Sequence, residues 1–258
     1  MSDPIIHMQG IKKRFGNVIA LNGVTFDVRP GECHCLLGDN GAGKSTFIKT
    51  MSVVHKPTEG TITFEGRPMQ FDSPRDAMEA GIATVFQDLA MIPLMSVTRN
   101  FFMGREPTKG RFIKRFDLES ANRITMEKMR QMVINLRAPD QAVGTLSGGE
   151  RQTVAIARAV HFGAKVLILD EPTSALGVRQ TSNVLATIAR VRAQGVGVVF
   201  ISHNVRHALA VGDRFTVLNR GQTLGTADKG QIDAAELQDL MAGGQELATL
   251  EGSLGGTV

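Results

Sequence analysis

The chain has 258 residues, of which 42% are hydrophobic and 21% are charged, and its formal net charge is +4. These values are ordinary for a globular soluble protein, and the length allows one large domain or two closely associated ones. No uninterrupted apolar run approaches the length needed to cross a bilayer, and residues 1–4 lack the basic and apolar regions of a secretory signal. We therefore expect a cytoplasmic protein, unless a partner holds it at a membrane.

Two features of the composition narrow the function further. The only cysteines, Cys33 and Cys35, lie two apart on one expected strand, where they cannot easily form a disulfide and offer no zinc-ligand spacing. The densest basic stretches, 12–14 and 105–115, are short, and without Trp or Tyr only Phe could stack on bases. The positive charge therefore predicts a solvated basic face rather than a nucleic-acid partner.

The N-terminal part of the chain contains short segments in which apolar and polar residues alternate. Residues 24–28 and 61–65 are examples, and each ends near Gly or Pro. This alternation is typical of antiparallel strands that have one face buried and the other in solvent.

Between these strands lies a complete phosphate-binding loop of the form G-x-x-x-x-G-K-[ST]. It consists of Gly38, Asp39, Asn40, Gly41, Ala42, Gly43, Lys44, Ser45 and Thr46. The glycines let consecutive N–H groups converge on phosphate oxygens, Lys44 can reach the β- and γ-phosphates, and the Ser45 hydroxyl can ligate Mg²⁺. Residues 34–37 predict a buried strand before the loop, and Lys44–Met51 predicts a helix whose N-terminus faces the anion. The alternative is a Gly-rich turn that binds nothing.

Runs dominated by apolar residues occur at 82–86, 166–169 and 196–201. Such runs are expected for parallel strands that are covered on both faces. Helical segments at 153–160 and 179–193 lie among them, which predicts βαβ units. The expected fold class is therefore α/β, with a parallel sheet and an antiparallel β subdomain.

Residues 88–145 have a different pattern, with a loop near 92–94, basic turns at 107–110 and a helical stretch at 118–136. Apolar residues recur there at helical spacing, namely Met126, Met129, Val133 and Leu136. We predict a helical subdomain inserted into the sheet domain.

Half of the twelve methionines lie in this insert. Most of them are expected to fill a core, because Met packs well into irregular gaps. Met91, Met95 and Met103, in the loops, are the best candidates for an adaptable partner-binding surface.

The strand at 166–169 ends in two acids, Asp170 and Glu171. Ligands of open parallel sheets bind beyond the carboxyl ends of the strands, where the phosphate loop is also expected. Asp170 could hold Mg²⁺, commonly through water, and Glu171 could polarise the water that attacks the γ-phosphate. Alone, the pair could equally be solvated acids at the end of a strand.

The segment 146–152, Leu-Ser-Gly-Gly-Glu-Arg-Gln, distinguishes this chain from other phosphate-loop ATPases. Ser147 can cap the helix that follows, and Gly148 and Gly149 leave N–H groups bare at its positive end. The segment therefore predicts a second anion site.

With these motifs in this order, the chain resembles the ATP-binding cassette proteins, the ATPase subunits that drive membrane transporters. The resemblance covers nearly all of residues 5–225. It implies a RecA-like phosphate-loop NTPase core formed by 1–87 and 146–225, with the helical subdomain at 88–145 completing the ATPase domain 1–225. A short C-terminal helix, Ala234–Met241, and a tail would follow within 226–258.

The resemblance also implies roles for individual residues. Phe15 would stack on the adenine, Gln87 would contact Mg²⁺ and the attacking water, and His203 would contact the γ-phosphate. Ser147, Gly148 and Gly149 would bind the γ-phosphate of an ATP held by the opposite subunit. Taken singly, Phe15 and His203 could be core residues and Gln87 a surface residue. Gln87 and His203 directly follow expected parallel strands, which independently favours the functional roles.

The resemblance implies a head-to-tail dimer of two copies with two ATP molecules between them. One departure from the family pattern is Gly177, which stands after Ser174-Ala175-Leu176 where Asp is usual. Glycine supplies no carboxylate and a looser backbone, so communication between the two sites could be weaker or could use another residue.

Softer similarities favour the importer branch for monosaccharides and related polyols. They lie at 13–16, 20–24, 38–41, 100–106 and 171–177. The resemblance then implies a homodimer at the cytoplasmic face of the membrane, beneath two permease subunits fed by a sugar-binding protein. The alternatives are an importer ATPase for another solute, such as an amino acid, and a non-transport cassette ATPase of translation or DNA repair.

Overall fold

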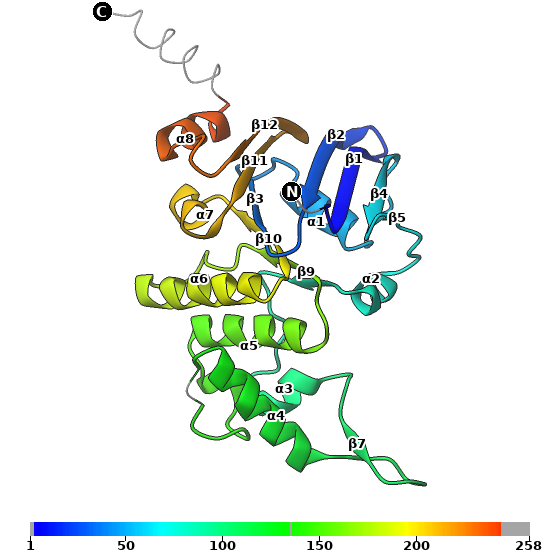
Figure 1. Ribbon diagram of the computed structural model, residues 1–258, viewed down its shortest axis with the longest axis vertical. Coiled ribbons are helices and arrows are strands. Elements are labelled where there is room, and N and C mark those ends of the chain that lie inside the picture. The colour runs from blue at the N-terminus through cyan, green and yellow to red at the C-terminus, as the bar shows by residue number, and fades with distance from the viewer. Residues whose placement is uncertain (1–2, 135, 244–258) are drawn as a thin grey trace, which may run out of the picture.

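The computed structural model describes residues 3–134 and 136–243 and contains two main sheets with helices packed around them (Figure 1). The larger sheet has six strands in the order β12-β11-β3-β10-β9-β6. Its strands are β3 (Cys33–Leu37), β6 (Ile82–Val85), β9 (Val166–Asp170), β10 (Gly197–Ser202), β11 (Arg214–Asn219) and β12 (Gln222–Asp228). All neighbours pair in parallel except β12, which is antiparallel to β11. The predicted parallel sheet is thus confirmed.

The second sheet is antiparallel and has four strands in the order β2-β1-β4-β5. Its strands are β1 (Ile6–Phe15), β2 (Val18–Val28), β4 (Glu59–Phe64) and β5 (Arg67–Pro68). Val24, Phe26 and Val28 are buried while Thr25 is exposed, so the alternation along β2 does separate a core face from a solvent face.

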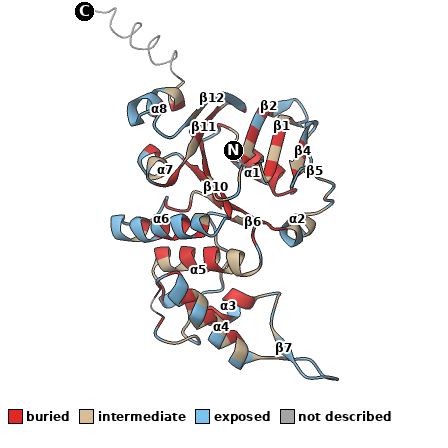
Figure 2. Ribbon diagram, viewed as in Figure 1, coloured by how far each residue is buried: buried red, intermediate tan, exposed pale blue. Residues whose placement is uncertain are grey.

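Helices cover both faces of the six-stranded sheet, and the alternation along β3 assigns each side chain to a face. Cys33, Cys35 and Leu37 belong to one buried cluster, which also contains residues of α5 and α6, whereas Leu36 joins Phe47 of α1 in the other. The helices are α1 (Lys44–Met51), α2 (Pro74–Ala80), α5 (Gly148–His161), α6 (Val178–Ala193), α7 (Val205–Val211) and α8 (Ala234–Met241). Both α5 and α6 carry several buried residues, coloured red in Figure 2. Both cysteines are free and buried.

Residues 88–145 contain two helices and a small hairpin. These elements are α3 (Val97–Phe102), β7 (Thr108–Lys109), β8 (Arg115–Phe116), α4 (Leu118–Gln131) and the short 3-10 helix Val143–Thr145. They lie on the far side of α5 from the six-stranded sheet (Figure 1). No described helix of the chain is both long enough and apolar enough to span a bilayer.

The prediction that α4 continues to residue 136 is wrong. The helix ends at Gln131, and Val133 adopts a left-handed backbone with φ 60° and is largely exposed. Met132, Ile134 and Leu136 are all buried. Residues two positions apart point to different faces of a helix, so a continuous helix could not bury all three in one core. Burial of these side chains therefore overrides the apparent helical repeat.

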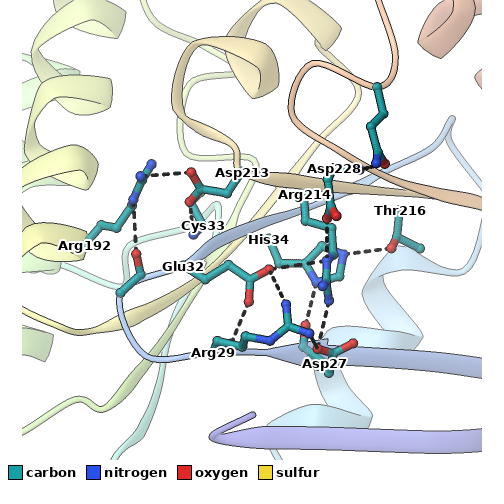
Figure 3. Close-up of polar contacts among 12 residues, drawn as sticks. Asp27, Arg29, Glu32, Cys33, His34, Arg192, Asp213, Arg214, Thr216 and Asp228 are labelled. Atoms are coloured by element: carbon teal, nitrogen blue, oxygen red, sulfur yellow. Dashed lines mark hydrogen bonds and ion pairs between the residues drawn. The ribbon is translucent and has the colours of Figure 1, made fainter. Parts of the chain in front are cut away.

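A polar network joins the two sheets at the edge where β3 begins (Figure 3). The Arg214 guanidinium donates to Asp27 of β2 at 2.8 Å and to Asp228 of β12 at 3.0 Å. Glu32 pairs with both Arg214 and Arg29, at 3.5 and 3.6 Å. Because the phosphate loop follows the other end of β3, this network is structural and distant from that loop.

His34 lies buried within the same region and stacks on Phe26, with ring centroids 3.9 Å apart. Its Nδ1–H donates to the Asp27 carbonyl, so Nε2 must accept from the Thr216 hydroxyl at 2.8 Å. Thr216 in turn bonds Thr226 at 2.8 Å. Burial lowers the pKa of His34 from 6.5 to about 4, so the ring is neutral in the folded chain.

This histidine should make the fold sensitive to acid. Below pH 6.5 His34 becomes protonated in the unfolded chain, whereas in the folded chain it stays neutral down to about pH 4. The free energy of unfolding therefore decreases as the pH falls from 6.5 to about 4. The loss amounts to roughly 3 kcal/mol. Urea unfolding from pH 7.5 to 4.5 measures it. His34→Gln, which cannot titrate, should show a flatter dependence, and identical slopes for both proteins would contradict the assignment.

Candidate functional site

The phosphate loop connects β3 to α1, as predicted. Lys44 is buried, and its Nζ donates to the carbonyls of Gly38 at 2.5 Å and Asp39 at 3.0 Å, so it lies across the loop. The residue before α1 is Gly43, which has φ 104° and makes no side-chain cap, leaving the first amides of the helix without a side-chain partner. The loop thus combines free amides at a helix N-terminus with one ammonium group, an arrangement suited to phosphate.

Two glycines of this loop are required by close contacts. A Cβ on Gly38 would collide with the Leu218 carbonyl, and one on Gly43 would lie 2.9 Å from the Ala20 carbonyl. The turn between β11 and β12 holds the loop from outside, because Gly221 N–H donates to the Ala42 carbonyl at 2.8 Å. Sequence reasoning missed β11, β12 and this support; the available signal was the largely apolar run 215–218, followed three residues later by Gly221.

The two acids lie at the carboxyl end of β9, on the same edge as the phosphate loop. Burial is the main cause that raises the pKa of Asp170, and the Glu171 carboxylate adds to it, while Lys44 and Lys49 oppose it. Glu171 has φ 46° and is 11% exposed at its side chain. A non-Gly residue in the left-handed region at such a position is held there by its surroundings.

Glu171 and His203 lie side by side, although Glu171 follows β9 and His203 follows β10. His203 Nδ1 is 2.9 Å from Glu171 Oε1, and the Ser202 hydroxyl donates to Glu171 Oε2 at 3.4 Å. The Glu171 amide donates to the Ile201 carbonyl at 3.0 Å, which ties the ends of β9 and β10 together. The carboxylate is therefore oriented by two partners, of which Ser202 was not predicted.

Gln87 lies two residues beyond β6, and its Nε2 is 3.5 Å from the Ser174 hydroxyl, next to the turn that begins at Glu171. That turn is fixed from the other side by Thr173, whose hydroxyl is 3.0 Å from His207 Nδ1. Gln87 is exposed, as a residue that contacts a ligand would be. Its predicted position beside the acids is consistent with these contacts, and its role stays a prediction.

Phe15 ends β1 and is 44% exposed. Its ring meets His55 edge-on at 5.1 Å, and Lys13 Nζ lies 5.0 Å from its centroid. An exposed aromatic ring can stack on a base. The stacking of Phe15 on the adenine stays a prediction.

The segment 146–152 begins α5, and Ser147 caps it as predicted. Ser147 accepts from the Glu150 amide at 3.3 Å, while Glu150 accepts from the Ser147 amide at 2.8 Å, a complete capping box. The two glycines also have a packing role that sequence reasoning missed. A Cβ on Gly148 would lie 2.8 Å from Leu176 Cδ2, and one on Gly149 would lie 2.9 Å from Gln180 Cβ of α6.

The phosphate loop and the Ser147 helix lie on opposite faces of the six-stranded sheet. α1 contributes Phe47 and Ile48 to the cluster on one face, and α5 contributes Val154 and Ile156 to the cluster on the other. A nucleotide on the loop of one chain would therefore not be expected to meet Ser147 of that chain.

Gly177, the departure from the family pattern, directly precedes α6 and provides no side-chain cap. Its φ of −68° suits any residue, and nothing lies within 4 Å of a Cβ placed there. An Asp would therefore fit without rearrangement, so neither crowding nor backbone geometry explains the glycine.

The side chains expected to hold Mg²⁺ are Ser45, Gln87 and Asp170. They offer a hydroxyl, an amide oxygen and a carboxylate, the hard oxygen donors that this ion prefers. Burial, and to a lesser degree the neighbouring Glu171 carboxylate, raise the pKa of Asp170, and a bound divalent cation would favour its ionised form. The residues present therefore fit Mg²⁺ held jointly with nucleotide phosphates.

The fold and these motifs define a phosphate-loop ATPase class, and comparison with known proteins makes the family explicit. The family model of the ABC transporter matches residues 21–174. The chain belongs to the ABC transporter family.

Named relatives cover most of the chain. The fructose import ATP-binding protein FrcA of Rhizobium meliloti is 42% identical over 249 residues, 95% of this chain and 96% of that protein. The xylose/arabinose import ATP-binding protein XylG of Sulfolobus acidocaldarius is 41% identical, covering 93% of this chain and 94% of its own. The ribose import ATP-binding protein RbsA 1 of Rubrobacter xylanophilus is 40% identical, but the match covers only 46% of it.

Solved structures confirm the fold. The crystal structure of the ADP conformation of an ATP-binding cassette from an ABC transporter superposes with a TM-score of 0.81, covering 97% of this chain and 100% of that one. Its sequence identity is 23%. A nucleotide-free cassette gives a TM-score of 0.79 at 24% identity, with 93% and 96% covered.

Proposed function

We propose that this chain is the ATP-hydrolysing subunit of an importer that takes up a sugar or polyol through a membrane permease. The observation that carries the proposal is that the phosphate loop, the Glu171–His203 pair and the capped helix of Ser147 occur in one chain on two faces of one sheet. The sugar specificity is supported by relatives named for fructose and xylose/arabinose import at 42% and 41% identity.

The proposed chemistry uses each residue where the structure places it. The amides at Gly43 and the Lys44 ammonium bind the β- and γ-phosphates of ATP, and Phe15 stacks on the adenine. Mg²⁺, when bound through Ser45, Gln87 and Asp170, neutralises charge that develops on the phosphates. Glu171, held by His203 and Ser202, accepts a hydrogen bond from the attacking water and polarises it.

The placement of the two anion sites supports a head-to-tail homodimer. Because α1 and α5 lie on opposite faces of the sheet, the Ser147 helix is available to a nucleotide bound by a second copy. Two ATP molecules would then lie between two phosphate loops and two Ser-Gly-Gly segments. ATP binds the closed dimer more tightly than the open one, whereas ADP and phosphate do not. This difference in affinity lets ATP binding and hydrolysis close and reopen the dimer.

The proposal divides the chain into an ATPase domain, 1–225, and a C-terminal segment, 226–258. The ATPase domain combines the RecA-like core and antiparallel β subdomain, 1–87 and 146–225, with a helical subdomain, 88–145. Of the C-terminal segment, α8 forms at Ala234–Met241 as predicted, and the tail beyond 243 lies outside the described residues.

A groove where residues 88–145 meet the sheet is the site we assign to the permease. Its volume is about 380 Å³. It is lined largely by apolar groups from β6, the following loop and α5, including Val85, Phe86, Met91, Met103 and Ala155. Gln87 lies next to its wall, so a permease segment in the groove would be coupled to the catalytic edge. Met91 and Met103, half-buried there, match the expected adaptable surface, while Met95 lines a neighbouring groove.

Reconstitution tests the proposal. The chain, its permease and a sugar-binding protein are placed in proteoliposomes, and ATP-dependent uptake is measured for pentoses, hexoses and myo-inositol. We expect uptake of one of these classes, and Met103→Glu in the groove should abolish uptake while the isolated chain still binds ATP. Leu224→Glu, on the exposed side of β12, is the control. Uptake of amino acids alone, or co-purification with ribosomes or DNA instead of a permease, would overturn the proposal.

A further inference from the structure

The hairpin formed by β7 and β8 projects away from the body of the protein, at the far end of the molecule from β12 (Figure 1). Residues 108–115 are all exposed. Its backbone pairs at Thr108 with Phe116 and at Lys109 with Arg115. Gly110, at φ 111°, shapes the tip, because a Cβ there would collide with the Ile113 carbonyl. The tip is thus a defined turn on a short ladder.

The tip combines charge and apolar surface in an unusual way. Phe112 is 92% exposed and Ile113 is 68% exposed. Four cations flank them, Lys109, Arg111, Lys114 and Arg115, and residues 108–116 contain no acid. The expectation of a solvated basic face accounts for the cations. It does not account for two bulky, exposed apolar side chains at the tip of a hairpin that projects from the body of the protein.

The charge of this tip is largely uncompensated within the described residues. Lys109 pairs with Asp117 at 3.4 Å, at the base of the hairpin. Arg111 instead lies 5.7 Å from the Phe112 ring, a contact that leaves its charge available. The other aromatic residue of the hairpin, Phe116, lies at the base beneath Arg99 and is half-buried. Only Phe112 and Ile113 are therefore presented outward.

We propose that this tip contacts the anionic headgroups of a lipid bilayer, with Phe112 and Ile113 entering the interface and the cations meeting lipid phosphates. Apolar side chains between Lys and Arg are the pattern that binds such an interface, because burial and headgroup attraction act together. A single exposed ring is a poor platform for nucleic acid, which needs successive stacked bases.

The position of the hairpin agrees with a membrane-facing role. It begins at Thr108, three residues after Arg105, which lines the groove assigned to the permease. The tip and the groove could therefore face one membrane together. The contact with lipid does not require the permease, so the proposed function and this inference can fail separately.

Vesicle binding by the purified full chain tests the inference. Sedimentation is measured with vesicles of phosphatidylcholine alone and with vesicles containing about 30% phosphatidylglycerol. We expect binding only to the anionic vesicles, and we expect it to weaken strongly between about 0.05 and 0.5 M salt, because the attraction is screened. The doubly substituted Arg111→Ser, Lys114→Ser chain should bind about 30-fold more weakly.

Two further doubly substituted chains separate the apolar contribution to vesicle binding from the contribution of charge. Phe112→Ser with Ile113→Ser keeps all four cations and should lower binding by about tenfold. The matched control is Arg67→Ser with Lys229→Ser, which removes the same charge from exposed positions elsewhere and should bind like the unchanged chain. ATP binding should be equal in all of them. Equal vesicle binding by tip and control variants would overturn the inference, as would a tip that binds permease protein but not protein-free anionic vesicles.

Discussion

Glu171→Gln is expected to lower the ATP hydrolysis rate by about 10²- to 10⁴-fold, the usual contribution of a general base, while ATP binding is retained. Gln has nearly the same shape, so the left-handed turn at φ 46° and the bond from Ser202 can persist. What is lost is the carboxylate that polarises water. Because binding precedes that step, the variant should accumulate as an ATP-bound dimer.

Phosphate release and gel filtration with and without ATP measure both effects. The control is Glu65→Gln, which removes an exposed carboxylate that pairs with Lys165, a contact of little energetic weight. It should hydrolyse ATP normally and dissociate after turnover. If Glu171→Gln turned over at the normal rate, or if it remained monomeric with ATP, the assignment of Glu171 as the base would be wrong.

Ser147→Asp is the second substitution with a large expected effect, because it tests the site contributed by the opposite subunit. Asp caps helices as well as Ser does, so α5 should remain folded. Its negative charge would, however, face the γ-phosphate held by the second copy. We expect unchanged ATP affinity in the monomer, no ATP-induced dimer, and at least a hundredfold loss of hydrolysis, on the order of the loss when a transition-state charge partner is removed.

The chain offers a closely matched control for this variant. Ser73 caps α2 in the same way, with Asp76 completing its capping box as Glu150 does for Ser147. Ser73→Asp therefore introduces the same side chain at the same kind of position, next to an acid, away from the phosphate loop. If both variants are equally stable to heat but only Ser147→Asp loses ATPase activity, the result would support a nucleotide site shared between two subunits. Full activity of Ser147→Asp would refute it.

The motifs that predicted the site share one property, which is that their chemistry is local. The phosphate loop, the Asp170–Glu171 pair and the Ser147 cap each depend on residues within one turn or one strand end. The strand before the loop, the helix Lys44–Met51 and the cap of α5 were accordingly confirmed. The roles of Phe15, Gln87 and His203 came from family resemblance, and they stay predictions.

Where prediction failed, distant contacts decided the conformation. The repeat through Val133 and Leu136 indicates a helix, yet burial of Met132 and Ile134 ends it at Gln131. Strands β11 and β12 were missed by the sequence reasoning; β11 is stabilised by pairing with β3, and β12 by pairing with β11 at the edge of the sheet. The glycines at 148 and 149 were interpreted as exposing amides, and only the approach of Leu176 and of Gln180 in α6 showed their packing role.

The sequence by itself therefore predicted ATP binding and hydrolysis in the manner of the family, because each motif that carries the prediction is contained in one short segment. The tertiary structure alone decided which groups meet: His203 with Glu171, Gln87 with Ser174, and the phosphate loop on the face opposite Ser147. It also decided that Phe112 and Ile113 stand exposed among cations rather than packed in a core. Such facts depend on which segments pack together, a property of the whole chain that no local pattern contains.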